Sequence, residues 1–259
     1  MVGTVDSLWR YPVKSMAGEA LDKVFFGCGG MYGDRMYGFV KSLTPTVAPF
    51  LTARDCPGMV RYRPRSRNRA LVNKPPNQSE ADQLGSELMP HYPGTSALMV
   101  DVEAPTGEML AVDNPMLLAQ LTRHLSKGQL SVIRSDRAMT DSYPVSLISL
   151  RTINQLGEEL NATLDKRRFR ANIYARLTGA PFAEDSFIGK RLQIGSHVVV
   201  AATIRDQRCK MITIDPDTAK ETPRIMRNVA RSHEGNAGIY CDVMTEGIVQ
   251  VGDPIALLN

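Results

Sequence analysis

The chain has 259 residues, 43% of them hydrophobic and 22% charged, with a formal net charge of +4 at pH 7. This size allows one large domain or two ordinary ones around a sizeable core, and the modest charge argues against a nucleic-acid binder, which would carry a concentrated basic face. No apolar run is long enough to span a bilayer and the N-terminal residues lack the apolar region of a signal peptide, so we expect neither membrane association nor secretion.

The first half of the chain is predicted to consist of short strands joined by turns. Alternation of apolar and polar residues predicts extended segments over 3–9, 20–26, 37–41, 50–54 and 59–63. Residues 64–93 show no period and are interpreted as an irregular surface excursion. A hairpin is expected over 97–102 and 108–112, followed by a helix that begins at Asn114 and Pro115 and ends at Gly128.

The second half is predicted to add two helices and several strands. A strand over 130–134 and a polar turn at 140–144 precede a helix that runs from Ser149 through Asn161, and Thr222 and Pro223 signal a shorter helix. Further strands are expected over 171–177, 191–194, 198–204, 211–214, 239–244, 248–251 and 254–258. This composition favours a mainly β, α+β barrel over a doubly wound sheet, and no GxGxxG or GKS/GKT motif indicates a nucleotide site.

Cys209 is the first candidate for chemistry, because cationic side chains flank it. Arg208 and Lys210 are its neighbours, and Arg205 lies four residues before it. Positive charge favours the thiolate, the form of cysteine that attacks electrophiles and binds soft metals. The alternative is a small buried hydrophobic residue, which is the common role of a lone cysteine in a strand.

Basic residues also recur at loop positions. The set comprises Lys14 beside Ser15, Arg35, Arg54, Arg168, Arg170 with Asn172, Arg205 and Arg208. Guanidinium groups at strand ends commonly hold a phosphate or another planar anion. If these loops converge, they form an anion pocket beside Cys209; the alternative is a set of dispersed surface charges.

The cysteines and histidines leave one further alternative open. The four cysteines are widely spaced, with no CxxC pair and no histidine at ligand spacing, so the sequence signals neither a zinc site nor an iron–sulfur cluster. Free thiols predict a cytoplasmic location. None of the four histidines lies in a hydrolase signature, but a spatial pairing of Cys209 with His233 stays open.

Several blocks together resemble the MOSC family, named for the C-terminal domain of molybdenum cofactor sulfurase, and within it the branch of the mitochondrial amidoxime-reducing component. The blocks are GTVDSLWRYPVKSM, GDR, FLTARDCPGMV, TDSYPVSLIS, RFRANI, IGKRLQIG, RCKMITIDPDT, GIYCDV and GIVQVGDPI. The resemblance implies a β-rich N-terminal domain over residues 1–128 and a MOSC β-barrel, of the pyruvate-kinase-like type, over residues 129–259.

The resemblance also implies a molybdenum cofactor, Mo-molybdopterin, whose metal takes the thiolate of Cys209 as a protein ligand. The residues that would hold the cofactor are Lys14, Ser15, Arg35, Thr140, Asp141, Ser142, Thr152, Arg170, Asn172 and Arg208. The chain departs from the amidoxime-reducing branch at Asp206 and Gln207, where those relatives carry a small polar residue and a further cysteine. These two residues are therefore expected to influence the choice of substrate.

The activity that the resemblance implies is the reduction of N-hydroxylated or N-oxide compounds by oxygen-atom transfer. Electrons would come from a separate donor of the ferredoxin, flavodoxin or cytochrome b5 type. The alternative is a protein that binds, carries or delivers the cofactor, or handles sulfur at Cys209, without turning over a small substrate.

Overall fold

The computed structural model describes residues 1–42, 49–67, 73–81, 83, 98–125, 127–136, 138–140 and 142–258. The strands are β1 Gly3–Arg10, β2 Glu19–Leu21, β3 Lys23–Gly27, β4 Gly30–Met31, β5 Tyr37–Lys41, β6 Arg63–Ser66, β7 Val100–Glu103, β8 Met109–Ala111, β9 Leu130–Arg134, β10 Val145–Ser149, β11 Ile173–Leu177, β12 Arg191–Ile194, β13 Val198–Gln207, β14 Asn236–Thr245, β15 Gly247–Gln250 and β16 Pro254–Leu258. The α-helices of the described residues are α1 Gln78–Ala81, α2 Pro115–Thr122, α3 Leu150–Glu159 and α4 Arg224–Ser232. Short 3-10 helices cover Pro57–Arg61, Lys166–Phe169, Ala183–Phe187 and Lys210–Thr213.

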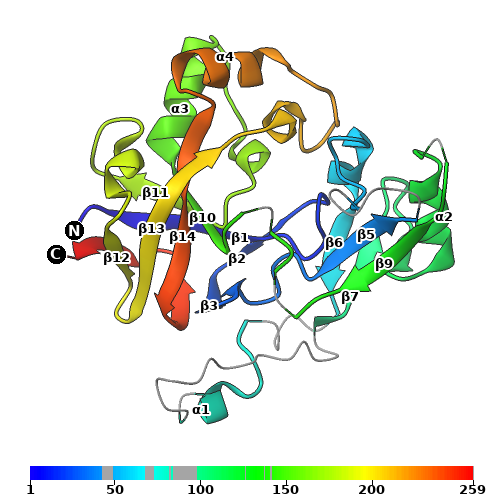
Figure 1. The fold of residues 1–259 in the computed structure, drawn as a ribbon, viewed down its shortest axis with the longest axis horizontal. Coiled ribbons are helices and arrows are strands. Elements are labelled where there is room, and N and C mark those ends of the chain that lie inside the picture. Colours follow the sequence, from blue (N-terminus) through cyan, green and yellow to red (C-terminus); the bar gives the residue numbers. More distant parts are fainter. Residues whose placement is uncertain are drawn as a thin grey trace.

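A closed barrel of seven strands forms the larger part of the molecule, which confirms the predicted mainly β fold class (Figure 1). Its strands follow the order β11-β10-β14-β13-β12-β16-β1, and β1 closes the barrel by pairing with β11. Neighbouring strands are antiparallel except β10 and β11, which are parallel. Apolar side chains such as Val5, Leu147 and Val200 fill the interior. Burial of this apolar surface supplies the main driving force for closure.

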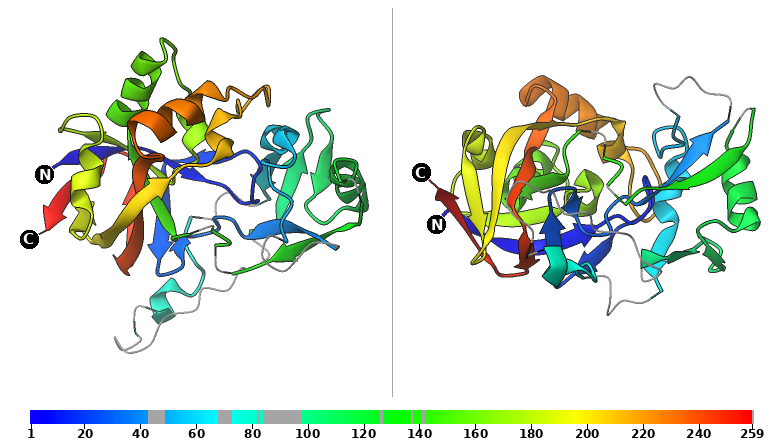
Figure 2. Two further views of the ribbon diagram at one scale, coloured as in Figure 1. Left: turned by 45° about the horizontal axis from the view of Figure 1, so that its top comes forward. Right: turned by 60° about the horizontal axis from the view of Figure 1, so that its bottom comes forward.

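Helices α3 and α4 lie together over one end of the barrel (Figure 2). Ile153 and Leu156 of α3 pack with Ile225 and Val229 of α4 in a second apolar cluster, which also contains Ile148 of β10. Strand β10 is buried along its whole length because one face meets the barrel interior and the other meets these helices. This explains why its residues, VSLIS, lack the alternation of a half-exposed strand, and why a strand was not predicted there.

Smaller sheets extend the molecule away from the barrel. They are β15-β3-β4, the pair β5-β9, and β6-β7-β8, with α2 packed beside β8 and β9 (Figure 1). The first strand of the chain belongs to the barrel, however, and β3 pairs with β15 from the far end of the sequence. The division of the sequence into two units at residues 128 and 129 stays a prediction. In three dimensions, strands from the two units pair with each other.

Two of the three predicted helix starts are confirmed by side-chain caps, and α4 begins directly after Thr222 and Pro223 without one. The Asn114 side chain accepts a hydrogen bond from the backbone N–H of Met116 at 2.8 Å, and Ser149 Oγ accepts one from Arg151 N–H at 3.2 Å. Helix α2 ends at Thr122 instead of continuing to Gly128. The backbone changes there to i→i+3 bonds, in which Leu125 N–H donates to the Thr122 carbonyl at 2.8 Å.

Three predicted strands are wrong because tight turns replace them. Within residues 50–54 only Phe50 forms a β-bridge, with Val40, and a turn follows in which Asp55 N–H donates to the Thr52 carbonyl at 3.0 Å. Residues 59–63 fall largely in the 3-10 helix Pro57–Arg61, where proline occupies the first turn and Met59 N–H donates to the Cys56 carbonyl at 3.0 Å. Residues 211–214 fall largely in the 3-10 helix Lys210–Thr213. Within the described residues, no helix has the length and apolar character needed to cross a membrane.

Candidate functional site

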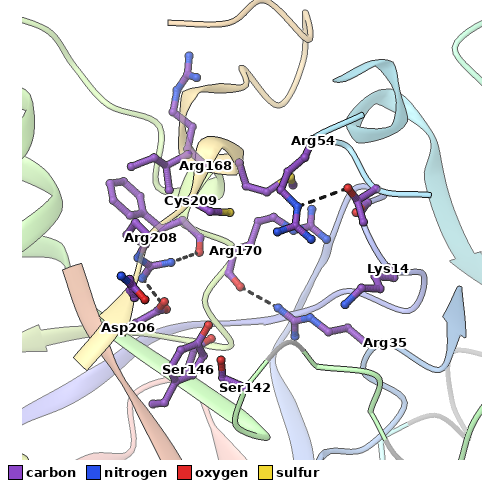
Figure 3. Close-up of a pocket in the computed structure, with 17 residues that line it drawn as sticks. Lys14, Arg35, Arg54, Ser142, Ser146, Arg168, Arg170, Asp206, Arg208 and Cys209 are labelled. Carbon is purple, nitrogen blue, oxygen red and sulfur yellow. Dashed lines mark hydrogen bonds and ion pairs between the residues drawn. The ribbon is translucent and has the colours of Figure 1, made fainter. Parts of the chain in front are cut away.

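A cavity of about 210 Å³ opens where the barrel meets loops from the N-terminal part of the chain, and we call it the Cys209 pocket (Figure 3). Its lining residues are Lys14, Ser15, Arg35, Thr52, Arg54, Ser142, Ser146, Arg168, Phe169, Arg170, Asp206, Gln207, Arg208, Cys209, Met211, Ile212 and Tyr240. They come from segments far apart in the sequence. The predicted convergence of basic loops beside Cys209 is therefore observed.

Cys209 lies at the point where β13 gives way to a tight turn. Arg208 N–H donates to the Gly235 carbonyl at 2.8 Å, and the Cys209 carbonyl accepts from Ile212 N–H at 3.2 Å. The chain thus turns at Cys209 and leaves it solvent-exposed, while Cys56 and Cys241 are buried. An exposed thiol at the mouth of a cavity contradicts the alternative of a buried hydrophobic cysteine.

Arg208 and Asp206 anchor the barrel side of the pocket. Both are buried, and Arg208 Nη2 lies 2.9 Å from Asp206 Oδ2. Arg208 also donates from Nε to the Ala237 carbonyl and from Nη1 to the Phe169 carbonyl, each at 2.7 Å. The guanidinium is held by protein groups on all sides, so Arg208 fixes the wall next to Cys209 and offers little to a ligand.

Tyr240 completes this side from β14. Burial and the neighbouring negative charge of Asp206 raise the pKa of the Tyr240 phenol above its ordinary value. The phenol therefore keeps its proton at neutral pH. The hydroxyl donates to Asp206, so its oxygen can accept a hydrogen bond in a pocket whose donors are mostly cationic.

The opposite side carries Lys14, Ser15 and Arg35 on two loops that pack against each other. Lys14 N–H donates to the Tyr37 carbonyl and Arg35 N–H donates to the Tyr11 carbonyl, both at 2.8 Å. Ser15 and Arg35 have φ angles of 68° and 46°, in the left-handed region that side chains rarely adopt. Arg170, which faces them, has a φ of 51°. Such strained residues gather at binding and catalytic sites, where the surrounding structure holds them in place.

Arg170 is a buried guanidinium whose surroundings disfavour its positive charge. Its guanidinium lies 4.3 Å from the centroid of the Tyr11 ring and donates to the Met16 carbonyl at 2.7 Å, while Arg35 donates to the Arg170 carbonyl at 3.2 Å. Burial, together with the positive charge of Arg35, lowers the pKa of Arg170 to about 10. A bound anion would relieve this repulsion.

The charges of the lining residues are strongly unbalanced. Among those that the structure describes, six are basic, namely Lys14, Arg35, Arg54, Arg168, Arg170 and Arg208, and one, Asp206, is acidic. Ion pairs with Asp34 and Asp215 behind the lining compensate only Arg35 and Arg168. The pocket is therefore suited to an anionic ligand.

Most residues predicted for the site line the Cys209 pocket: Lys14, Ser15, Arg35, Ser142, Arg170, Asp206, Gln207, Arg208 and Cys209. Asp141 lies outside the described residues. Thr140 is described but is not among the lining residues. It follows Met139, whose carbonyl accepts a hydrogen bond from Lys14 Nζ at 3.0 Å.

Asn172 and Thr152 lie behind the site. Asn172 is buried, and its side chain accepts from Ser146 N–H at 3.1 Å and donates to Asp34 at 3.2 Å, so it supports two residues next to the ligand cavity. Thr152 is fully buried and donates from Oγ1 to Glu184 at 2.7 Å. It joins the start of α3 to another loop and does not line the pocket.

Some lining residues were not predicted as site residues. Thr52, Ser146 and Tyr240 come from ordinary-looking strand and loop segments, and only their position in the fold reveals them. Arg54 and Arg168 carried a signal, since both belong to the set of basic loop residues.

Arg205 does not join the pocket, because it is exposed and pairs with Glu234 at 2.6 Å. His233 contacts Glu159 at 3.0 Å and does not line the pocket, so the predicted alternative of a Cys209–His233 pair has no support.

Comparisons with known proteins agree with the resemblance seen in the motifs. A family model described as "MOSC domain" matches residues 134–256, and one described as "MOSC N-terminal beta barrel domain" matches residues 2–107. Molybdenum cofactor sulfurase of Drosophila grimshawi is 31% identical over 161 residues, which make up 59% of this chain and 20% of that protein. The sulfurase of Drosophila willistoni is 35% identical over 141 residues, which make up 53% of this chain and 16% of that protein.

The chain thus spans a fifth or less of the length of these curated relatives. A solved structure, the YUAD protein from Bacillus subtilis, aligns with 99% of this chain and 96% of its own at 16% identity and a TM-score of 0.49. With matches to both family models in order along the sequence, the chain belongs to the MOSC family, carries its N-terminal beta barrel domain ahead of the MOSC domain, and is related to molybdenum cofactor sulfurase.

Proposed function

We propose that the Cys209 pocket binds a molybdenum cofactor with Cys209 as the protein ligand of the metal, and that the protein reduces N-hydroxylated or N-oxide compounds. The observation that carries this proposal is an exposed thiol set among six basic side chains and one carboxylate. A soft sulfur donor and an anion-binding wall in one cavity match a ligand that contains both a soft metal and a phosphate.

The donor set fits such a cofactor. One cysteine cannot complete the coordination of a metal, so the remaining ligands must come from the bound group, as the two dithiolene sulfurs of molybdopterin would provide. The phosphate of the cofactor would be held by Lys14, Ser15, Arg35 and Arg170, and Ser142 would contact the pterin. The low pKa of Arg170 supports this assignment, because a bound phosphate favours the charged guanidinium.

When bound, the cofactor would supply two-electron oxygen-atom transfer, and the protein residues would prepare the site for it. Cys209 binds as the thiolate, and the buried pair of Arg208 and Asp206 keeps the backbone of Cys209 in position. Tyr240 retains its proton, which it donates to Asp206, and its oxygen can accept a hydrogen bond from a polar substrate atom. Gln207 at the mouth offers both a donor and an acceptor. A separate electron carrier of the ferredoxin, flavodoxin or cytochrome b5 type would deliver the electrons.

Metal analysis tests the ligand role of Cys209 directly. Protein from a host that makes molybdenum cofactor is expected to contain nearly one molybdenum per chain, and Cys209→Ala is expected to lose it. Cys28→Ala is the matched control, since Cys28 is a half-buried thiol outside the pocket and its loss should leave the metal content unchanged. Full retention of molybdenum in Cys209→Ala would refute the thiolate ligand.

An activity measurement then separates the enzyme from a carrier. The molybdenum-loaded protein is expected to reduce a model amidoxime with reduced viologen as the artificial donor, and Cys209→Ala is expected to be inactive. If the protein contains molybdenum but turns over neither an amidoxime, a hydroxylamine nor an N-oxide, then cofactor binding or delivery is the function, and the reductase proposal fails.

A further inference from the structure

A second cavity, of about 190 Å³, adjoins the Cys209 pocket, and we call it the Trp9 pocket. The two cavities share Arg168, Arg170 and Met211 in their linings. Trp9, on β1, and Arg63, at the start of β6, line only the second cavity. Neither the motifs nor the cofactor proposal assigns a role to this cavity.

Trp9 gives the cavity an aromatic surface. The indole is half-buried, so part of the ring is exposed to the cavity, while its Nε1 atom is inaccessible to solvent. Tyr11 also lines the cavity, but its ring is buried under Arg170. Trp9 is therefore the ring available to a ligand.

The charges around this cavity leave two guanidinium groups without a carboxylate. Five arginines line it with one acidic residue, Asp217. Three of them form ion pairs: Arg65 with Glu103, Arg167 with Asp165 and Asp217, and Arg168 with Asp215. Among the described residues, Arg63 and Arg170 form no ion pair with a carboxylate. Two uncompensated positive charges beside an indole suit a ligand with one or two negative charges and a flat ring.

We propose that the Trp9 pocket binds a small aromatic anion, an aromatic ring that carries a carboxylate or a phosphate ester. The ring packs against Trp9, and the anionic group lies between Arg63 and Arg170. Both guanidinium groups can bind a carboxylate or a phosphate through paired hydrogen bonds, and an aromatic ring adds contact area that a bare anion lacks. The proposal involves no metal. Of the residues proposed to hold the cofactor it uses Arg170, so it is tested on protein from a host without molybdenum cofactor.

The intrinsic fluorescence of the protein reports on this site alone, because Trp9 is the only tryptophan among the 259 residues. The full chain is titrated with phenyl phosphate and with benzoate, which distinguish the two anionic groups. Inorganic phosphate and benzyl alcohol each provide only half of the ligand. Excitation at the red edge of the tryptophan band avoids absorption by the probes. We expect a saturable fluorescence change with at least one aromatic anion, and at least about tenfold weaker binding of both half-ligands.

Two exposed arginines provide the matched variants. Of these two pockets, Arg63 lines only the Trp9 pocket and Arg54 only the Cys209 pocket; Arg63 also borders a further cavity beside Glu103. Arg63→Gln is expected to weaken binding of the aromatic anion about tenfold and Arg54→Gln to leave it unchanged, with Arg63→Lys restoring part of the affinity. The absence of a saturable response would overturn the proposal. So would equal losses in Arg63→Gln and Arg54→Gln, or inorganic phosphate binding as tightly as phenyl phosphate, because each places the ligand elsewhere or removes the aromatic contribution.

Discussion

The two sides of the Cys209 pocket carry the same kind of charge for different purposes. On the barrel side, Arg208 has every part of its guanidinium engaged by Asp206 or by backbone carbonyls. On the loop side, Arg54 is exposed, forms no ion pair among the described residues, and has only a 3.5 Å contact from its Nε to Thr52 Oγ1 (Figure 3). A basic side chain in a pocket can therefore build the wall or bind the ligand, and its own hydrogen bonds distinguish the two roles.

The largest loss of stability is expected from a substitution of Arg208, on the barrel side of the pocket. Arg208→Met removes the cation that pairs with the buried Asp206 and the guanidinium donors to two backbone carbonyls, so we expect the free energy of unfolding to fall by about 3–5 kcal/mol. Arg54→Met is the matched change on the loop side and should alter stability by less than about 0.5 kcal/mol. Urea denaturation measures both variants. Similar losses in the two would show that the sides of the pocket do not differ as described.

Thr152 tests a residue that the motifs assign to the cofactor and the fold places behind the pocket. Its Oγ1 donates to Glu184 at 2.7 Å and accepts from Phe182 N–H at 2.9 Å. Thr152→Val removes both bonds in a buried site, so we expect a loss of about 2 kcal/mol in unfolding free energy. Molybdenum content per folded chain should stay unchanged. A loss of molybdenum without a loss of stability would show that Thr152 contributes to cofactor binding.

The loop side should dominate the response to a simple anion. In protein from a host without molybdenum cofactor, inorganic phosphate at about ten times its Kd should stabilise the fold by roughly 1.4 kcal/mol, seen as a rise in Tm. Arg54→Gln should reduce this rise. Arg205→Gln should not, since Arg205 is an exposed arginine paired with Glu234 outside the pocket. Equal reductions in both variants would indicate general charge attraction instead of a defined site.

The smallest expected effect concerns Asp215, which holds Arg168 at 2.7 Å. Burial would raise the pKa of Asp215, but hydrogen bonds from Thr218 and Asp217 and the charge of Arg168 hold it below its usual value. The carboxylate therefore stabilises the fold above the unfolded-state pKa of about 3.9, and this contribution is lost as the pH falls through the lower folded-state value. Asp215→Asn should cost about 1 kcal/mol at pH 7 and almost nothing near about pH 2. A deficit that does not change with pH would exclude the charge as its cause.

Elements with strong local signals could be predicted from the sequence. The strands Tyr37–Lys41, Arg191–Ile194 and Pro254–Leu258 match their predicted bounds, because each has strand-forming residues between clear turn signals. The caps at Asn114 and Ser149 are also local features. The prediction of a strand directly after Cys209 was wrong. Met211, Ile212 and Thr213 instead form part of a 3-10 turn, which buries Ile212 and Thr213.

The sequence could predict which residues of β13 lie near the site, but not the directions in which their side chains point. Alternation along β13 would place Ala202, Ile204 and Asp206 on one face, yet Ala202 and Asp206 are buried while Ile204 is 43% exposed. The register with β14 shifts between Ala202 and Ile204 and again between Arg205 and Gln207, which marks bulges in the strand pair. A bulge changes the face on which the following side chains lie, and it depends on the partner strand. The same reason hides Tyr240, whose place in the pocket depends on that pairing.

The closing strand of the barrel determines when the site can assemble during synthesis. β1 pairs with β11 and with β16, and Val2 N–H donates to the Ile255 carbonyl at 2.7 Å, so both ends of the described chain meet at one edge (Figure 2). The barrel cannot close until β16 has left the ribosome. Contacts between such distant segments make folding slow, and until β16 is added the start of β1 lacks one of its partner strands. The loop carrying Lys14 and Ser15 follows β1 directly, so this side of the pocket gains its full support only when the barrel closes.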